Sequence, residues 1–108
     1  MTSLVPMSLP TAGCISVVDQ DGVPVLQLAG EIDVETVAGH ERAGTSLAPV
    51  SGVDLGEVTF LSSSAVSFLI RQTQPIRQRG QLPAITSVSA HARRVLELLG
   101  VTGLFAPI

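Results

Sequence analysis

The 108-residue chain has little of what most catalytic and nucleic-acid-binding sites require. It contains no tryptophan, tyrosine or lysine, and its six basic residues are all arginine. Its formal net charge is −3, and no stretch combines basic with aromatic side chains in the way typical of nucleic-acid-binding surfaces. We therefore expect no direct contact with nucleic acid.

Cysteine and histidine are also scarce. Cys14 is the only cysteine, so it has no internal disulfide partner, and its place in the run C-I-S-V-V predicts a small buried thiol. His40 and His91 lie far apart, and neither belongs to a cluster with metal-ligand spacing. No acid–base pair, nucleotide-binding loop or metal cluster is visible, so we expect no cofactor and no enzymatic activity.

Long apolar runs are missing as well. No stretch approaches the roughly 18 apolar residues of a membrane-spanning helix. The first residues lack the basic region of a signal peptide, and Pro6 and Pro10 interrupt their apolar pattern. These features predict a cytoplasmic protein without membrane insertion, with a loose N-terminal segment at 1–12 and one domain at 13–108.

The chain is rich in aliphatic side chains, which fall into segments with strand-like and helix-like patterns. It is 45% hydrophobic and 14% charged, which suffices for a compact core. The segments predict strands at 15–18 and 23–29, a helix at 34–47, a strand at 53–55, a helix from about 64 to Gly80, a strand at 84–88 and a helix between Ser89 and Gly100. This β-β-α-β-α-β-α order indicates an α/β fold: an opening hairpin, then parallel strands, in one small mixed sheet with helices packed on it.

Short signals support these boundaries. Asp21-Gly22 is typical of a tight hairpin turn, because glycine accepts positive φ. Asp33 and Ser89 are suited to cap the helices that follow them. Pro75 lacks the N–H that would bond the carbonyl of Arg71, so a kink or a break is predicted there.

Three consecutive serines, Ser62–Ser64, separate a predicted strand from a predicted helix. One serine is explained by capping, since its hydroxyl accepts a hydrogen bond from a free N–H of the first turn. A hydrolase nucleophile is disfavoured, because the frame L-S-S-S-A lacks the glycines of the nucleophile elbow and neither histidine has supporting context. Phosphorylation remains open, because a helix N-terminus tolerates a phosphate whose charge would still disrupt a partner interface.

Three longer segments together resemble one family. They are V-L-Q-L-A-G-E-I-D, D-L-G-E-V-T-F-L-S-S-S-A-V-S-F-L and S-V-S-A-H-A-R-R-V-L-E-L-L-G-V-T-G-L-F. In order and spacing they resemble the STAS domain of bacterial anti-anti-sigma factors, over nearly all of residues 14–105. The family's small mixed sheet with packed helices agrees with the predicted fold.

The resemblance implies a switch in partner binding. Family members that are unphosphorylated bind an anti-sigma factor, which is a serine kinase, and so release a sigma factor and permit transcription. The kinase phosphorylates a serine at this turn and ends the binding, and a phosphatase restores it. The family pattern D-S-S-G or D-S-T-G places the acceptor on Ser64, with Ser63 as the alternative. Asp33, Ser62, Ser63 and Ser64 are the implied partner-binding residues.

Two positions depart from the family pattern. Ser62 stands where the family has aspartate, and Ala65 where it has glycine. The first change removes a charge that could shape the turn and contact the kinase, and the second adds a Cβ where close approach could be needed. A different role therefore stays open: a STAS subunit of a lipid-transport complex, or a stressosome-type scaffold, without a phosphoswitch. Oligomeric state stays open too.

Overall fold

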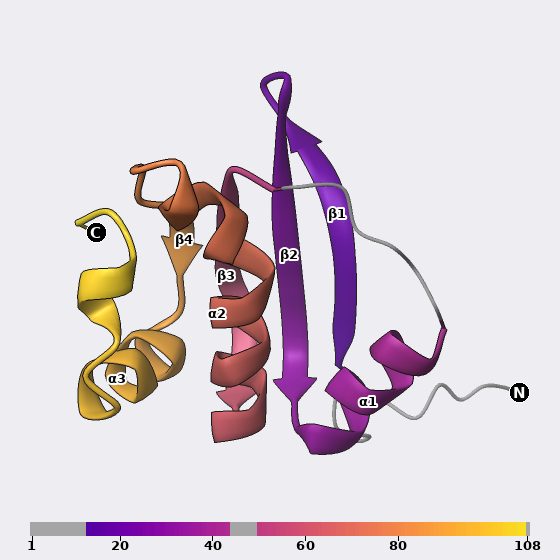
Figure 1. Ribbon diagram of the computed structural model, residues 1–108. Coiled ribbons are helices and arrows are strands. Elements are labelled where there is room, and N and C mark those ends of the chain that lie inside the picture. The colour runs from indigo at the N-terminus through magenta and orange to yellow at the C-terminus, as the bar shows by residue number, and fades with distance from the viewer. Residues whose placement is uncertain (1–12, 44–49, 108) are drawn as a thin grey trace, which may run out of the picture.

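The computed structural model describes residues 13–43 and 50–107. Its elements are β1 (Cys14–Gln20), β2 (Val23–Ile32), α1 (Val34–Arg42), β3 (Gly52–Leu61), α2 (Ser63–Gln78), β4 (Ala84–Val88), α3 (Ala90–Leu98) and the short 3₁₀ helix η1 (Thr102–Leu104) (Figure 1). The predicted β-β-α-β-α-β-α order is confirmed, with η1 as an unpredicted addition.

The four strands form one mixed sheet in the order β1-β2-β3-β4. β1 pairs with β2 antiparallel, and β2, β3 and β4 run parallel, as predicted. The hairpin turns at Asp21 and Gly22, whose φ values of 56° and 82° are those of a tight primed turn. The Gly22 N–H also donates to the Asp19 carboxylate over 2.6 Å.

The two faces of the sheet differ in chemistry. On one face, buried side chains such as Leu26, Leu28 and Val53 join a single apolar core with all three helices, in which Phe68 of α2 and Phe105 are the largest side chains. On the other face, the Gln20 amide donates to Asp54 over 2.8 Å. This asymmetry is typical of a sheet that is covered by helices on one side. In Figure 1, α2 crosses in front of β3.

A kink or a break was predicted at Pro75; the helix does not break there, because α2 continues to Gln78. Side chains bond carbonyls in the turn before the proline: the Thr73 hydroxyl donates to the Leu69 carbonyl over 2.8 Å, and the Arg77 guanidinium donates to the carbonyl of Ile70. Both acceptors lie within the turn before the proline, and neither is the Arg71 carbonyl, whose backbone donor Pro75 removes.

Other boundaries needed smaller corrections. The Cys14 side chain is exposed, not buried, because it begins the edge strand β1. β3 continues beyond the predicted 53–55 and ends at Leu61, where the strand before the serines was expected to end, at Phe60 or Leu61. α1 ends at Arg42. Residues 44–47 of the predicted helix lie outside the described residues. So does the predicted N-terminal segment at 1–12.

Candidate partner-binding site

The predicted site residues lie at one edge of the sheet. β2 and β3 are parallel, so their carboxyl ends meet at the same edge, and each strand leads directly into a helix. Asp33 separates β2 from α1, and Ser62 separates β3 from α2. The Ser62 N–H donates to the Ile32 carbonyl over 2.9 Å and ties the two junctions together. Figure 1 shows both helices starting at this edge.

Asp33 caps α1, as its sequence context predicted. Its Oδ1 accepts from the Thr36 N–H and from the Thr36 hydroxyl, both over 2.9 Å. The hydrogen bond from the Thr36 N–H is the main reason why the pKa of Asp33 lies below its ordinary value. The carboxylate, which is ionised at neutral pH like any ordinary aspartate, places a negative charge beside the three serines.

Ser62 caps α2. Its Oγ accepts from the Ala65 N–H over 3.1 Å, with the extended backbone that an N-cap residue adopts. The family's aspartate is an equally good capping residue, so the serine preserves the turn while removing a charge. Ala65 is fully buried, which means that its extra Cβ packs into the core and does not obstruct the surface.

The other two serines have no part in the cap. Ser63 is exposed, and Ser64 is half-buried and lines a groove between α1 and α2. Among the described hydrogen bonds, none involves the hydroxyl of Ser63 or Ser64. The hydroxyl that the family pattern selects, that of Ser64, is therefore neither buried in the core nor needed for the turn.

The groove between the two helices, which we call the α1–α2 groove, has a volume of about 280 Å³. Its lining residues are Val34, Val37, Ala38 and Glu41 from α1, and Ser64, Ser67 and Arg71 from α2. Arg71 and Glu41 form an ion pair across it with an Nη2–Oε2 distance of 3.0 Å, and both side chains are about half exposed. Val34, at the serine end, is 58% exposed.

A second exposed apolar group lies at this edge. Phe60, near the end of β3, is 44% exposed, and its ring centroid lies 5.7 Å from that of His91 on α3. Neither Phe60 nor the Arg71–Glu41 pair was identified from the sequence. The alternation of apolar residues in β3 assigns Phe60 to a strand without telling which face is covered, and the ion pair joins residues 30 positions apart.

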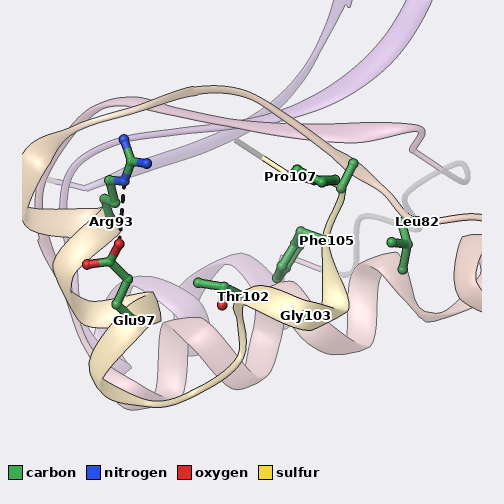
Figure 2. A pocket seen from close by; sticks show the side chains of 8 residues that line it. Leu82, Arg93, Glu97, Thr102, Gly103, Phe105 and Pro107 are labelled. Atoms are coloured by element: carbon green, nitrogen blue, oxygen red, sulfur yellow. Dashed lines mark ion pairs between the residues drawn. The ribbon is translucent and has the colours of Figure 1, made fainter.

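A larger hollow of about 410 Å³ lies elsewhere, between α3 and the C-terminal segment (Figure 2). It is lined by Leu82, Arg93, Glu97, Thr102, Gly103, Phe105, Ala106 and Pro107. Arg93 and Glu97 form an ion pair of 3.5 Å along α3. The hollow contains none of the predicted site residues, and its polar groups lack the arrangement of a nucleophile with a base.

Across residues 13–43 and 50–107, no group of three or more His, Cys, Asp or Glu side chains could hold a metal ion. Within the same part of the chain, none of the helices has the length and apolar character needed to cross a membrane.

Comparisons with known proteins agree with this fold. A family model described as "Mlab, STAS domain" matches residues 15–106. The anti-sigma-F factor antagonist RsfB, found in Mycobacterium tuberculosis strains CDC 1551 and H37Rv, is 35% identical over 103 residues, covering 92% of this chain and 84% of the relative. An anti-sigma factor antagonist from Mycobacterium paratuberculosis superposes with a TM-score of 0.68 at 28% identity, covering 87% of this chain and 83% of that structure. The chain belongs to the STAS domain family.

Proposed function

We propose that this protein is an anti-anti-sigma factor that acts in the cytoplasm. In its unphosphorylated form it binds an anti-sigma factor, a serine kinase, and thereby releases a sigma factor. Phosphorylation of Ser64 by that kinase ends the binding, and a phosphatase restores it. The names of the mycobacterial relatives, all sigma-factor regulators, support this role.

The proposal rests on one observation: the serine that caps α2 is not the serine that lines the α1–α2 groove. Ser62 holds the helix start, with its hydroxyl on the Ala65 N–H. Ser64 lines the α1–α2 groove, where its hydroxyl takes part in no described hydrogen bond. A kinase can therefore modify Ser64 without dismantling the cap.

The surroundings of Ser64 support an effect on binding more than on folding. A phosphate near the N-terminus of α2 faces unpaired N–H groups and the positive end of the helix dipole. It adds nearly two negative charges to a surface that already carries Asp33 and Glu41 and exposes Val34. A partner complementary to the neutral groove would meet both repulsion and desolvation.

Phosphorylation by the kinase tests the acceptor directly. The protein is incubated with a recombinant anti-sigma factor kinase of the same organism and ATP, and intact mass and peptide mapping are measured. We expect one added phosphate on Ser64, retained in Ser63→Ala and absent in Ser64→Ala. A phosphate that persists in Ser64→Ala and maps to Ser63 would reassign the acceptor. No phosphate in any of the three proteins would reject the switch.

A STAS subunit of a lipid-transport complex, or a stressosome-type scaffold, is the second candidate. It stays open because Ser62 and Ala65 stand where the family's phosphorylated turn has aspartate and glycine. Affinity purification from the native organism separates the two. Recovery of a permease and an ATPase would support the transport role, and recovery of a kinase would support the proposed switch.

We also propose that residues 13–108 form the functional domain and that 1–12 make no contribution to binding. A chain that starts at residue 13 is expected to bind the kinase with the affinity of the full chain, as measured by calorimetry. A tenfold weaker affinity would place binding contacts in the N-terminal segment.

A further inference from the structure

The α1–α2 groove has one cation, Arg71, among its lining residues. Ser64, Ser67 and Arg71 line the same groove from α2. Residues seven positions apart on a helix lie on one face, separated by about 10 Å along the axis. The Arg71 guanidinium now bonds Glu41 across the groove. Helical side chains lean toward the N-terminus, so a long side chain at position 71 has the reach to turn toward Ser64.

The present partner of Arg71 is easily displaced. The Arg71–Glu41 pair has one described contact of 3.0 Å, and the two side chains are 53% and 49% exposed. Exposed ion pairs of this kind are weak, because water screens them and two long side chains must be held in place. A phosphate offers more charge than a carboxylate, and its geometry suits two parallel bonds from one guanidinium.

We propose that phosphorylated Ser64 captures Arg71 from Glu41, so that the phosphate is bound within the α1–α2 groove by the protein's own arginine. This rests on the proposed function insofar as Ser64 is the modified residue. The exchange breaks the ion pair that joins α1 to α2 and leaves Glu41 without its cation. Phosphorylation thereby alters the groove along its length, at the Arg71 end as well as at the serine end.

The charges around the phosphate define the expected competition. Arg71 is the one cation among the groove's lining residues, Glu41 competes for it, and Asp33 lies at the adjoining helix start. Contact with Arg71 favours the doubly charged phosphate and lowers its proton affinity. Removing Arg71 should raise the proton affinity, whereas removing the Glu41 charge should lower it.

The test uses full-length protein with phosphoserine incorporated at position 64 during translation, so no kinase is needed. Phosphorus NMR follows the phosphate titration in the parent, Arg71→Gln, Glu41→Gln and Arg93→Gln. Arg93 pairs with Glu97 on α3, away from the groove, and is the matched control. We expect the proton affinity to rise about threefold in Arg71→Gln, to fall in Glu41→Gln and to stay unchanged in Arg93→Gln.

Equal titration in all four proteins would overturn the inference. If Arg71→Gln fails to fold, the opposite change expected for Glu41→Gln still decides the question. Partner binding is measured separately on the same samples. If the phosphate titration shifts in the variants while the phosphorylated protein still binds its partner, the Arg71 contact is supported and the switch is rejected. If the phosphorylated protein no longer binds while all titrations are equal, the switch is supported and the Arg71 contact is rejected.

Discussion

α2 and α3 begin with the same kind of serine N-cap, but the residues that follow the cap differ. Each follows a parallel strand, and each begins with a serine whose hydroxyl accepts from the N–H three residues later over 3.1 Å. In both, that third residue is a fully buried alanine, Ala65 or Ala92. The positions between are Ser63 and Ser64 in α2, but Ala90 and His91 in α3.

The comparison teaches which serines the fold requires. α3 shows that a cap of this kind needs one serine and a small buried residue, and nothing between them that carries a hydroxyl. The extra hydroxyls of α2 therefore have no structural counterpart. Ser64 differs further because it lines a groove bounded by a second helix.

The largest expected effect comes from placing a charge at each start. Ser64→Asp should weaken binding to the anti-sigma factor kinase at least a hundredfold, about 2.7 kcal/mol, because it mimics part of the phosphate charge in the groove. Ala90→Asp adds the same charge to the first turn of α3 and should leave the affinity within about threefold. Calorimetric titration measures both, and equal losses would show that net charge, not the groove, controls binding.

Removing either cap should have a similar effect on stability. Ser62→Ala and Ser89→Ala are each expected to lower the free energy of unfolding by about 1 kcal/mol, since each leaves a first-turn N–H without its acceptor. Ser64→Ala should change it by less than about 0.5 kcal/mol. Urea denaturation checks all three. A loss in Ser64→Ala as large as that in Ser62→Ala would mean that the two serines share the structural task.

Restoring the family's residue at the cap is a subtler change. Ser62→Asp keeps an acceptor for the Ala65 N–H and adds a negative charge at the positive end of the α2 dipole. We expect a gain of about 0.5 kcal/mol in the free energy of unfolding, measured by urea denaturation. Ser89→Asp is the matched control and should gain a similar amount. A destabilised Ser62→Asp with a stabilised Ser89→Asp would reveal repulsion by nearby Asp33.

The third cap at this edge is Asp33. It makes the free energy of unfolding depend on pH, which the serine caps do not. Its pKa is lower in the folded protein, so it contributes stability at pH values above its unfolded pKa, near 4, and that contribution is lost as the pH falls through the folded pKa. The difference in unfolding free energy between the parent and Asp33→Asn should shrink below about pH 4. The parent and Ser62→Ala should differ by a constant amount over the same range, as followed by thermal denaturation.

Much of this architecture was predictable because its signals are local. The hairpin at Asp21-Gly22 and the caps at Asp33 and Ser89 each follow from a few neighbouring residues. Two local signals misled: Pro75, because α2 continues through it to Gln78, and Cys14, because its strand lies at the edge of the sheet.

The site was predictable only in part. The choice of Ser64 came from a family resemblance, whereas the role of Ser62 as the cap was settled by one hydrogen bond. The groove could not be predicted, because it arises where α1 and α2 pack together. Glu41 and Arg71 meet across 30 residues of sequence, and no periodicity within either helix indicates which partner each will find.

The central claim, that modification of Ser64 controls partner binding without disturbing the fold, is tested most directly by one affinity measurement. The protein with phosphoserine at position 64 is titrated against the anti-sigma factor kinase beside the unmodified protein, after denaturation has established that both are equally stable. We predict an affinity at least a hundredfold weaker for the modified protein. Equal affinities would contradict the account.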